Sequence, residues 1–169
     1  MRNIITSFLL IQIVLCFFSL NAQDKETYSL VNSSFSGEIT VSVDLDYLLY
    51  FPATYKKTEP YPLLIFLHGD GGQKDINLIR TYGPPKLIEQ GREFPFICLA
   101  PQLPGETHWN PDVLYALLQE ILKNYSIDKN RIYLTGLSRG GFGTWEFAVS
   151  YPELFAAIAP VCARGISGI

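Results

Sequence analysis

Short apolar runs recur along the chain, separated by segments in which apolar residues have helical spacing. A run of about five apolar or β-branched residues, bounded by Pro, Gly or polar positions, is typical of a strand buried on both faces of a sheet. Such runs occupy residues 63–67, 96–100, 131–135 and 155–161. Because helical segments lie between them, the pattern predicts an α/β domain in which helices cover both faces of a mostly parallel sheet.

Two of the helical segments are predicted from spacing and from local signals. Residues 111–124 repeat apolar side chains every three or four positions, as an amphipathic helix does. Asn110 is suited to cap the amino end of this helix, and Pro111 suits its first turn. Residues 78–90 predict a second helical segment, which the Gly-Pro-Pro sequence at residues 83–85 must interrupt.

The pattern also predicts elements near both ends of the domain. Residues 39–43 alternate polar and apolar positions, and residues 46–51 are rich in aromatic and aliphatic side chains, so they predict an early antiparallel pair of strands. A helix is predicted between residue 139 and Pro152, and its large side chains are expected to pack in the core or along the helix face. These side chains are Phe142, Trp145 and Phe147.

The first residues have the features of an export signal. Arg2 gives a positive start, residues 8–18 are apolar apart from one glutamine, and Ala22 provides a small residue at a cleavage point. We predict a signal peptide at residues 1–22, a secreted or periplasmic location, and one domain at residues 23–169. An uncleaved anchor is the alternative, but the apolar stretch is shorter than the ~20 residues that a membrane span needs.

Composition narrows the classes of function. The formal net charge is −3 and only 17% of residues are charged, so no basic stripe is available for nucleic acid. Cys98 and Cys162 lie in or beside apolar strand-like runs and predict buried free thiols rather than a disulfide. No cluster of Cys and His has the spacing of metal ligands, and no phosphate-binding loop is present, so no metal or cofactor is expected.

The most specific motif is the G-x-S-x-G sequence at residues 136–140, which contains Ser138. It follows a predicted strand and precedes a predicted helix, the context that defines a nucleophile elbow. Gly136 and Gly140 would let strand and helix approach closely around a serine with positive φ. The alternative is a tight glycine-rich turn without catalytic function.

Four segments together resemble α/β-hydrolases of the secreted esterase and predicted-peptidase type. This group includes polyhydroxybutyrate-depolymerase-like and feruloyl-esterase-like enzymes, with dienelactone-hydrolase and prolyl-oligopeptidase-like domains as broader relatives. The resemblance implies a three-layer α/β-hydrolase fold over about residues 45–163. The segments are residues 67–72, 100–102, 128–141 and 151–157.

The resemblance also implies an oxyanion hole made of backbone N–H groups. The N–H of Arg139, the residue after the nucleophile, is one expected donor. The H-G-x-G-like sequence at residues 68–71 implies a second donor, the N–H of Asp70 or of Gly71. A glycine-rich turn without catalytic function remains the alternative. The Arg139 side chain is expected either to face a substrate carboxylate or to pair with a nearby acid.

Both histidines precede Ser138, whereas this type of hydrolase places its base after the nucleophile. We expect His68 to be structural, with its ring hydrogen-bonded to backbone. His108 and Trp109 lie in a loop that leaves a strand, so they are candidates for substrate binding, with loop packing as the alternative for His108. The triad base is His108 only if it reaches Ser138 Oγ.

The resemblance implies an Asp and a His after Ser138, yet Glu146 and Glu153 are the acids that follow it and no histidine does. We therefore expect a fold without its last strands, in a fragment or a prematurely ended reading frame. The 169 residues alone should be inactive or nearly so, because the oxyanion hole without a triad supports only residual catalysis. The final strand should leave an apolar edge uncovered.

These expectations combine into one functional hypothesis and its alternatives. The hypothesis is a secreted carboxylic-ester hydrolase that acts through an acyl-Ser138 intermediate on a small-molecule or polysaccharide-linked ester. It would bind no nucleic acid and would not insert stably into a membrane after signal cleavage. A prolyl-oligopeptidase-like peptidase and an acyltransferase share every motif, and a non-catalytic binding protein or decayed fragment is the alternative of another class.

Overall fold

The computed structural model describes residues 34, 36–37, 40, 42–69, 75–103 and 108–164. The chain divides into two compact units, Met1–Thr40 and Val41–Ile169. The described residues of the first unit are all exposed, and the fold that follows is that of the second unit. The predicted signal peptide lies outside the described residues. In the part of the chain that the structure describes, no helix is both long and apolar enough to cross a bilayer.

The second unit is built on a five-stranded sheet in the order β1-β3-β2-β4-β5. The four predicted buried strands and the predicted strand at residues 46–51 are present, and the four strands from β2 onward run parallel, as the alternation with helices predicts. Among the described strands, β1 alone runs antiparallel to its neighbour. The bounds are β1 Tyr47–Tyr50, β2 Tyr61–Leu67, β3 Ile97–Pro101, β4 Ile127–Leu137 and β5 Ala157–Val161.

The predicted pairing of residues 39–43 with residues 46–51 is wrong. The described residues of the first segment, at 40, 42 and 43, are exposed and belong to no strand, whereas β1 pairs with β3. Alternate residues of β1 pack on opposite faces of the sheet, Leu48 on one and Leu49 on the other. Pairing with the edge of β3 therefore gives β1 apolar contacts on both faces of the sheet. Pairing with the exposed residues at 40, 42 and 43 would not give such contacts.

The helices follow the local signals of the sequence. Helix α3, Pro111–Asn124, has the predicted bounds, and Asn110 Oδ1 accepts the N–H groups of Asp112 (2.9 Å) and Val113 (3.4 Å). The segment predicted around residues 78–90 is divided, as expected, into the 3₁₀ helix η1 and the helix α2. The remaining helical bounds are η1 Ile76–Thr81, α2 Gly83–Glu89, α4 Arg139–Ser150 and the 3₁₀ helix η2 Pro152–Leu154.

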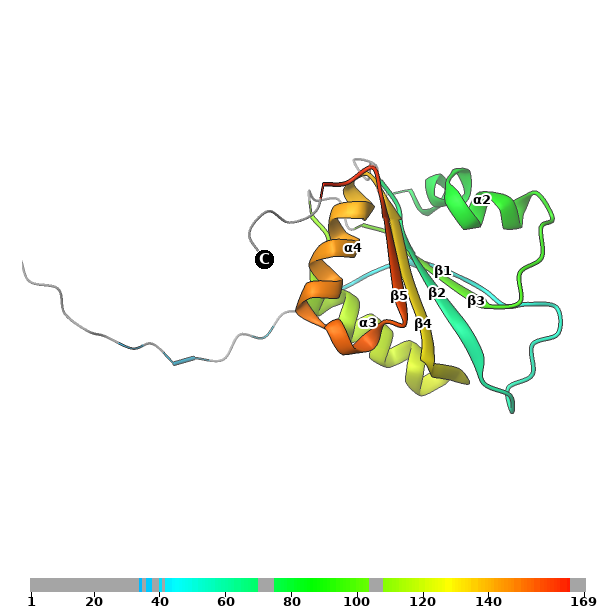
Figure 1. The fold of residues 1–169 in the computed structure, drawn as a ribbon, viewed down its shortest axis with the longest axis horizontal. Coiled ribbons are helices and arrows are strands. Elements are labelled where there is room, and N and C mark those ends of the chain that lie inside the picture. The colour runs from blue at the N-terminus through cyan, green and yellow to red at the C-terminus, as the bar shows by residue number, and fades with distance from the viewer. Residues whose placement is uncertain are drawn as a thin grey trace, which may run out of the picture. The chain divides into compact units, whose positions relative to one another are not determined.

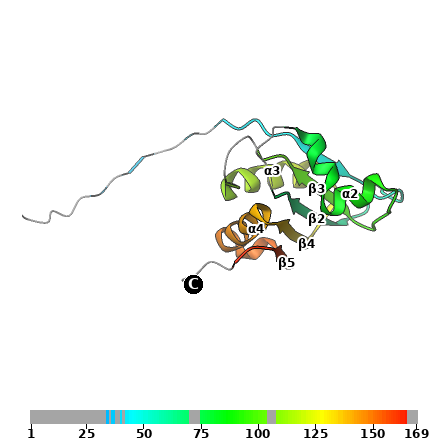
Figure 2. The ribbon, with the colours of Figure 1, turned by 90° about the horizontal axis from the view of Figure 1, so that it is seen from above.

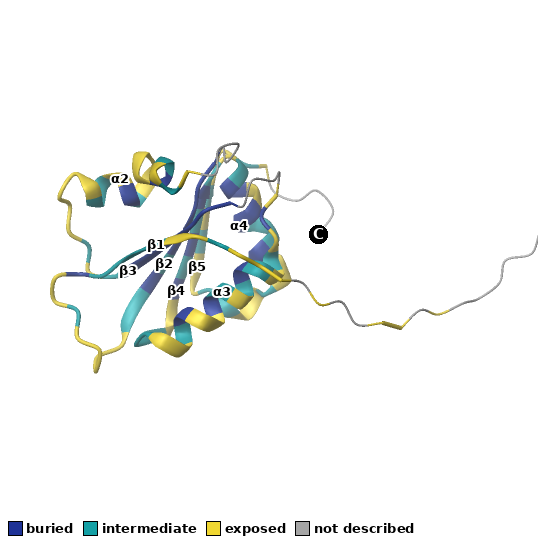
Figure 3. Cartoon of the chain, turned by 180° about the vertical axis from the view of Figure 1, so that it is seen from behind, coloured by how far each residue is buried: buried dark blue, intermediate teal, exposed yellow. Residues whose placement is uncertain are grey.

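The sheet is covered on both faces, which gives the three-layer architecture (Figures 1 and 2). Helices α3 and α4 lie on one face, where the larger core contains Leu63, Leu67 and Leu118, all with no exposed surface. Helix α2 lies on the other face with a smaller cluster that includes Phe66 and Cys98. Figure 3 shows buried residues along the inner strands and exposed residues on the outer sides of α2 and α3.

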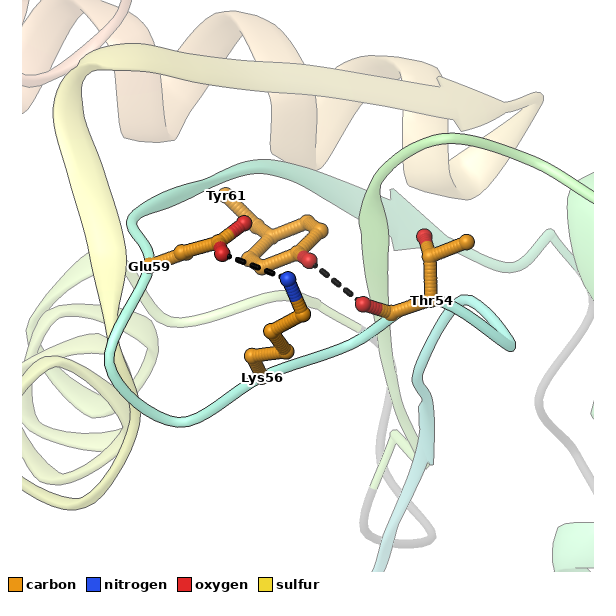
Figure 4. Close-up of polar contacts among 4 residues, drawn as sticks. All are labelled: Thr54, Lys56, Glu59 and Tyr61. Carbon is orange, nitrogen blue, oxygen red and sulfur yellow. Dashed lines mark hydrogen bonds and ion pairs between the residues drawn. The ribbon is translucent and has the colours of Figure 1, made fainter.

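Local polar contacts hold the connection from β1 to β2 (Figure 4). This connection leads to the start of β2, whereas the other end of β2 pairs with Gly136 near Ser138. The Tyr61 hydroxyl donates to the backbone oxygen of Thr54 at 2.7 Å, and Lys56 pairs with Glu59 at 2.8 Å. Both side chains of the ion pair are exposed, so the pair is worth about 0–1 kcal/mol. This end of the sheet therefore serves the fold, and the candidate chemistry lies at the other end.

Candidate active site

Ser138 is the single residue between strand β4 and helix α4. Its backbone has φ 55° and ψ −112°, which confirms the predicted positive φ. Its N–H donates to the Val161 carbonyl at 2.8 Å, and its own carbonyl accepts the N–H of Phe142 at 3.1 Å. Such a conformation costs about 1–3 kcal/mol and persists only where the surroundings hold it. The side chain is exposed and makes no cap bond to α4, so it stands at the surface where the strand meets the helix.

The glycines of the motif allow the close approach of backbone segments. A Cβ at Gly140 would lie 1.9 Å from the carbonyl oxygen of Leu67 in β2. A Cβ at Gly136 would lie 2.2 Å from the carbonyl oxygen of Gly140. Neither glycine is among the glycines with positive φ, so space rather than backbone conformation excludes a side chain here. The elbow thus requires glycine at both positions, as predicted.

Ser138 opens onto a cavity of about 520 Å³ that runs along one face of α4. Residues 139, 142, 143 and 146 recur at the three- and four-residue spacing that puts side chains on one helix face. Phe142 is 45% exposed, so the prediction that it packs in the core or along the helix is wrong: it lines the cavity. The lining is His108, Trp109, Ser138, Arg139, Phe142, Gly143 and Glu146.

Trp109 forms a buried wall of this cavity. It is 3% exposed, and its ring meets the His68 ring edge-on with centroids 5.2 Å apart. A Cβ at Gly143 would lie 2.5 Å from Trp109 Cδ1, so the absence of a side chain on α4 lets the indole lie against the helix. The indole N–H is buried and has no acceptor among the described residues. The tryptophan is therefore held against α4 in the lining of the cavity that Ser138 shares.

The two histidines occupy different environments. His68 is 3% exposed, and its Nε2 accepts the backbone N–H of Leu103 at 3.0 Å. This confirms the prediction of a structural histidine, because the lone pair that a base would use is already engaged. His108 is exposed and lines the same cavity as Ser138. The structure thus brings His108, a candidate for substrate binding, to the same cavity as Ser138.

The structure describes one of the expected oxyanion donors, Arg139. Arg139 is the first residue of α4, at the end of the helix where backbone N–H groups carry partial positive charge. Asp70 and Gly71 lie outside the described residues. The residue before them, Gly69, is described, and a Cβ there would lie 3.5 Å from Ser138 Cβ. The loop that leaves β2 therefore starts beside Ser138.

Three lining residues were not predicted as part of the site, namely Phe142, Gly143 and Glu146. The sequence could have indicated Phe142 and Glu146, because they lie four and eight positions after Ser138 and share one face of the helix that follows it. Among the described residues, no three side chains of His, Cys, Asp or Glu gather as metal ligands would.

Known proteins resemble this chain over most of the described fold. A protein family described as "Putative esterase" matches residues 37–163. Feruloyl esterase B of Thermothelomyces thermophilus is 32% identical over 125 residues, a match that covers 62% of this chain and 42% of that protein. Poly(3-hydroxyalkanoate) depolymerase C of Paucimonas lemoignei is 44% identical over 45 residues, which is 27% of this chain and 11% of that protein.

The arrangement of elements is also similar to that of solved esterases. The crystal structure of a thermostable esterase superposes with a TM-score of 0.58 at 31% identity, covering 74% of this chain and 39% of that one. The match therefore spans less than half of the length of each of these three proteins. Together with the mixed sheet, the likeness places the described unit in the α/β-hydrolase fold, of which it contains a part.

Proposed function

The chain belongs to the esterase family, and from that membership we propose that it is a serine hydrolase that cleaves carboxylic esters through an acyl-Ser138 intermediate. The observation that carries the proposal is the placement of Ser138. Its hydroxyl-bearing side chain is exposed at a strained turn, next to the amino end of α4 and at the mouth of a cavity. Two relatives whose names describe an esterase and a depolymerase support ester cleavage.

In the proposed reaction, Ser138 Oγ attacks the carbonyl carbon of an ester and its proton passes to a base. The negative charge on the carbonyl oxygen would be held by the N–H of Arg139 and by an N–H from Asp70 or Gly71. The bond to the alcohol oxygen then breaks, the alcohol leaves with the proton, and water cleaves the acyl-serine in a second step. We propose that the ester belongs to a small molecule or to a polysaccharide-linked group.

Neither of the two histidines fits the role of the base. His68 is unsuited because its Nε2 already accepts a backbone N–H. His108 precedes Ser138, whereas α/β-hydrolases place the base after the nucleophile. We therefore propose that neither histidine of these 169 residues is the base and that these residues alone turn over esters only at a residual rate. A His108→Ala variant that loses Ser138 labelling would assign the base to His108 instead.

The test is covalent labelling of the natural, folded protein with a fluorophosphonate, with Ser138→Ala as the matched control. We expect the phosphorus to bond to Ser138 Oγ in the wild type and no labelling of the variant. Absence of labelling in soluble, folded wild-type protein would overturn the proposal in favour of a non-catalytic role. Parallel assays with a short-chain p-nitrophenyl ester and a peptide amide would then separate an esterase from a peptidase.

We propose that the protein is exported, on the pattern of residues 1–22. The expected mature protein begins at Gln23, directly after the predicted cleavage at Ala22. Amino-terminal sequencing of the protein recovered from the culture medium or periplasm tests this directly.

A further inference from the structure

Two residues that are not glycine have positive φ in the described part of the chain, and they lie side by side. Ser138 and Cys162 both have φ 55°. Each directly follows a strand, and the last residues of these strands, Leu137 in β4 and Val161 in β5, are register partners. Strained residues of this kind cluster where the structure serves a function. The second strained residue is thus next to the candidate nucleophile at the carboxyl edge of the sheet.

A hydrogen bond couples the two strained turns. The N–H of Ser138 donates to the carbonyl of Val161 at 2.8 Å. That carbonyl belongs to the planar peptide group that joins Val161 to Cys162, so its direction depends on the φ that Cys162 adopts. Any change in the conformation of Cys162 therefore reaches the backbone of Ser138 through one peptide group.

The same turn also rests on the first turn of α4. A Cβ at Gly141 would lie 2.6 Å from the carbonyl oxygen of Val161 and 2.8 Å from Ala163 Cβ. The turn over residues 161–163 therefore contacts the helix at a position that only glycine can occupy. The Cys162 side chain is exposed, so its thiol is not what packs the turn in place.

We propose that Cys162 is a positioning residue for Ser138. Its left-handed backbone directs the Val161 carbonyl at the Ser138 N–H, and this bond holds the strained backbone from which Oγ projects. The assignment rests on the proposed function of Ser138 as nucleophile. It requires that the backbone conformation of Cys162 matters and that its sulfur does not.

Three substitutions separate the backbone from the sulfur. Cys162→Gly favours positive φ, Cys162→Ala removes the sulfur alone, and Cys162→Val adds a β-branch that strongly disfavours positive φ. We expect the rate constant of fluorophosphonate labelling to fall about tenfold or more in the Val variant and to stay within about twofold in the other two. Ester turnover should show the loss in kcat with KM unchanged, because Cys162 does not line the Ser138 cavity.

Either of two results would overturn the proposal: equal labelling in all variants, or a loss in the Ala and Gly variants as large as in the Val variant. Circular dichroism checks that each variant is folded. If the Val variant does not fold, the proposal is tested by the Tm and the labelling of the Gly variant. We then expect its Tm to be higher by about 2–4 °C, since strain is relieved, with unchanged labelling; a lower Tm with lost labelling contradicts the assignment.

Amide hydrogen exchange at Ser138 provides a readout that does not depend on catalysis. We expect exchange of the Ser138 N–H to be at least tenfold faster in the Val variant, because the bond to Val161 is weakened, and unchanged in the Gly variant. If the wild type is not labelled but this difference is observed, the proposed function fails while the structural coupling stands. If labelling of Ser138 occurs and exchange is the same in all variants, the coupling fails alone.

Discussion

Strands β3 and β5 look alike in sequence but differ in their surroundings. Both are five-residue apolar segments, and both were predicted as buried strands. Every residue of β3 is buried, because β1 and β2 flank it and helices cover both its faces. In β5 exposed residues alternate with half-buried ones, and its paired neighbour within the described residues is β4. Hydropathy therefore predicts that a segment is a strand, whereas the neighbours in the sheet determine how deeply it is buried.

The two cysteines show the same contrast at the level of single side chains. Cys98 lies within β3 and is buried, as predicted. The prediction that Cys162 is buried is wrong, because it follows the last residue of β5 and is exposed. An apolar context in the sequence favours burial only where a second layer covers that position.

Truncation of a core side chain in β3 should have the largest effect on stability. Leu99 is 1% exposed and packs in the larger core, so Leu99→Ala should lower the free energy of unfolding by about 2–5 kcal/mol. The matched change in β5, Val161→Ala, removes a side chain that is 45% exposed and should cost less than about 1 kcal/mol. Urea denaturation of both variants measures the difference. Equal losses would mean that β5 is as deeply covered as β3 in solution.

The buried thiol of Cys98 in β3 should make the free energy of unfolding depend on pH. Burial raises the pKa of Cys98 to about 12 from its ordinary value of 9.0. Between these values the unfolded chain loses the thiol proton and the folded chain keeps it, so the stability contributed by the neutral thiol is complete below pH 9 and falls above it. The free energy of unfolding should decrease by about 1.4 kcal/mol per pH unit above pH 9, relative to Cys98→Ala.

Chemical denaturation at pH 8, 9 and 10 checks this slope. The Cys98→Ala variant is the control because it retains every other group that titrates in this range. Equal slopes in the wild type and the variant would show that the thiol is hydrated in the folded protein.

The parts of the fold that could be predicted are those with local causes. The bounds of α3 follow from Asn110, Pro111 and the apolar spacing, and the elbow follows from Ser138 with glycines two residues to either side. What could not be predicted depends on contacts between distant segments. The pairing of β1 with β3 joins residues about fifty positions apart. The exposure of Phe142 and the strained turn at Cys162 likewise depend on what packs beside them.

The smallest effect is expected for a charge on the outer face of β5. Ala157 is exposed at the start of this strand, so Ala157→Lys in the 169-residue chain should change the free energy of unfolding by no more than about 0.5 kcal/mol. A lysine at an edge strand also opposes pairing with another chain. Light scattering should therefore be lower for the variant than for the wild type at each protein concentration. Urea denaturation supplies the first measurement. A loss above about 1.5 kcal/mol would mean that a further layer covers β5 in the folded protein, and the contrast with β3 would then vanish.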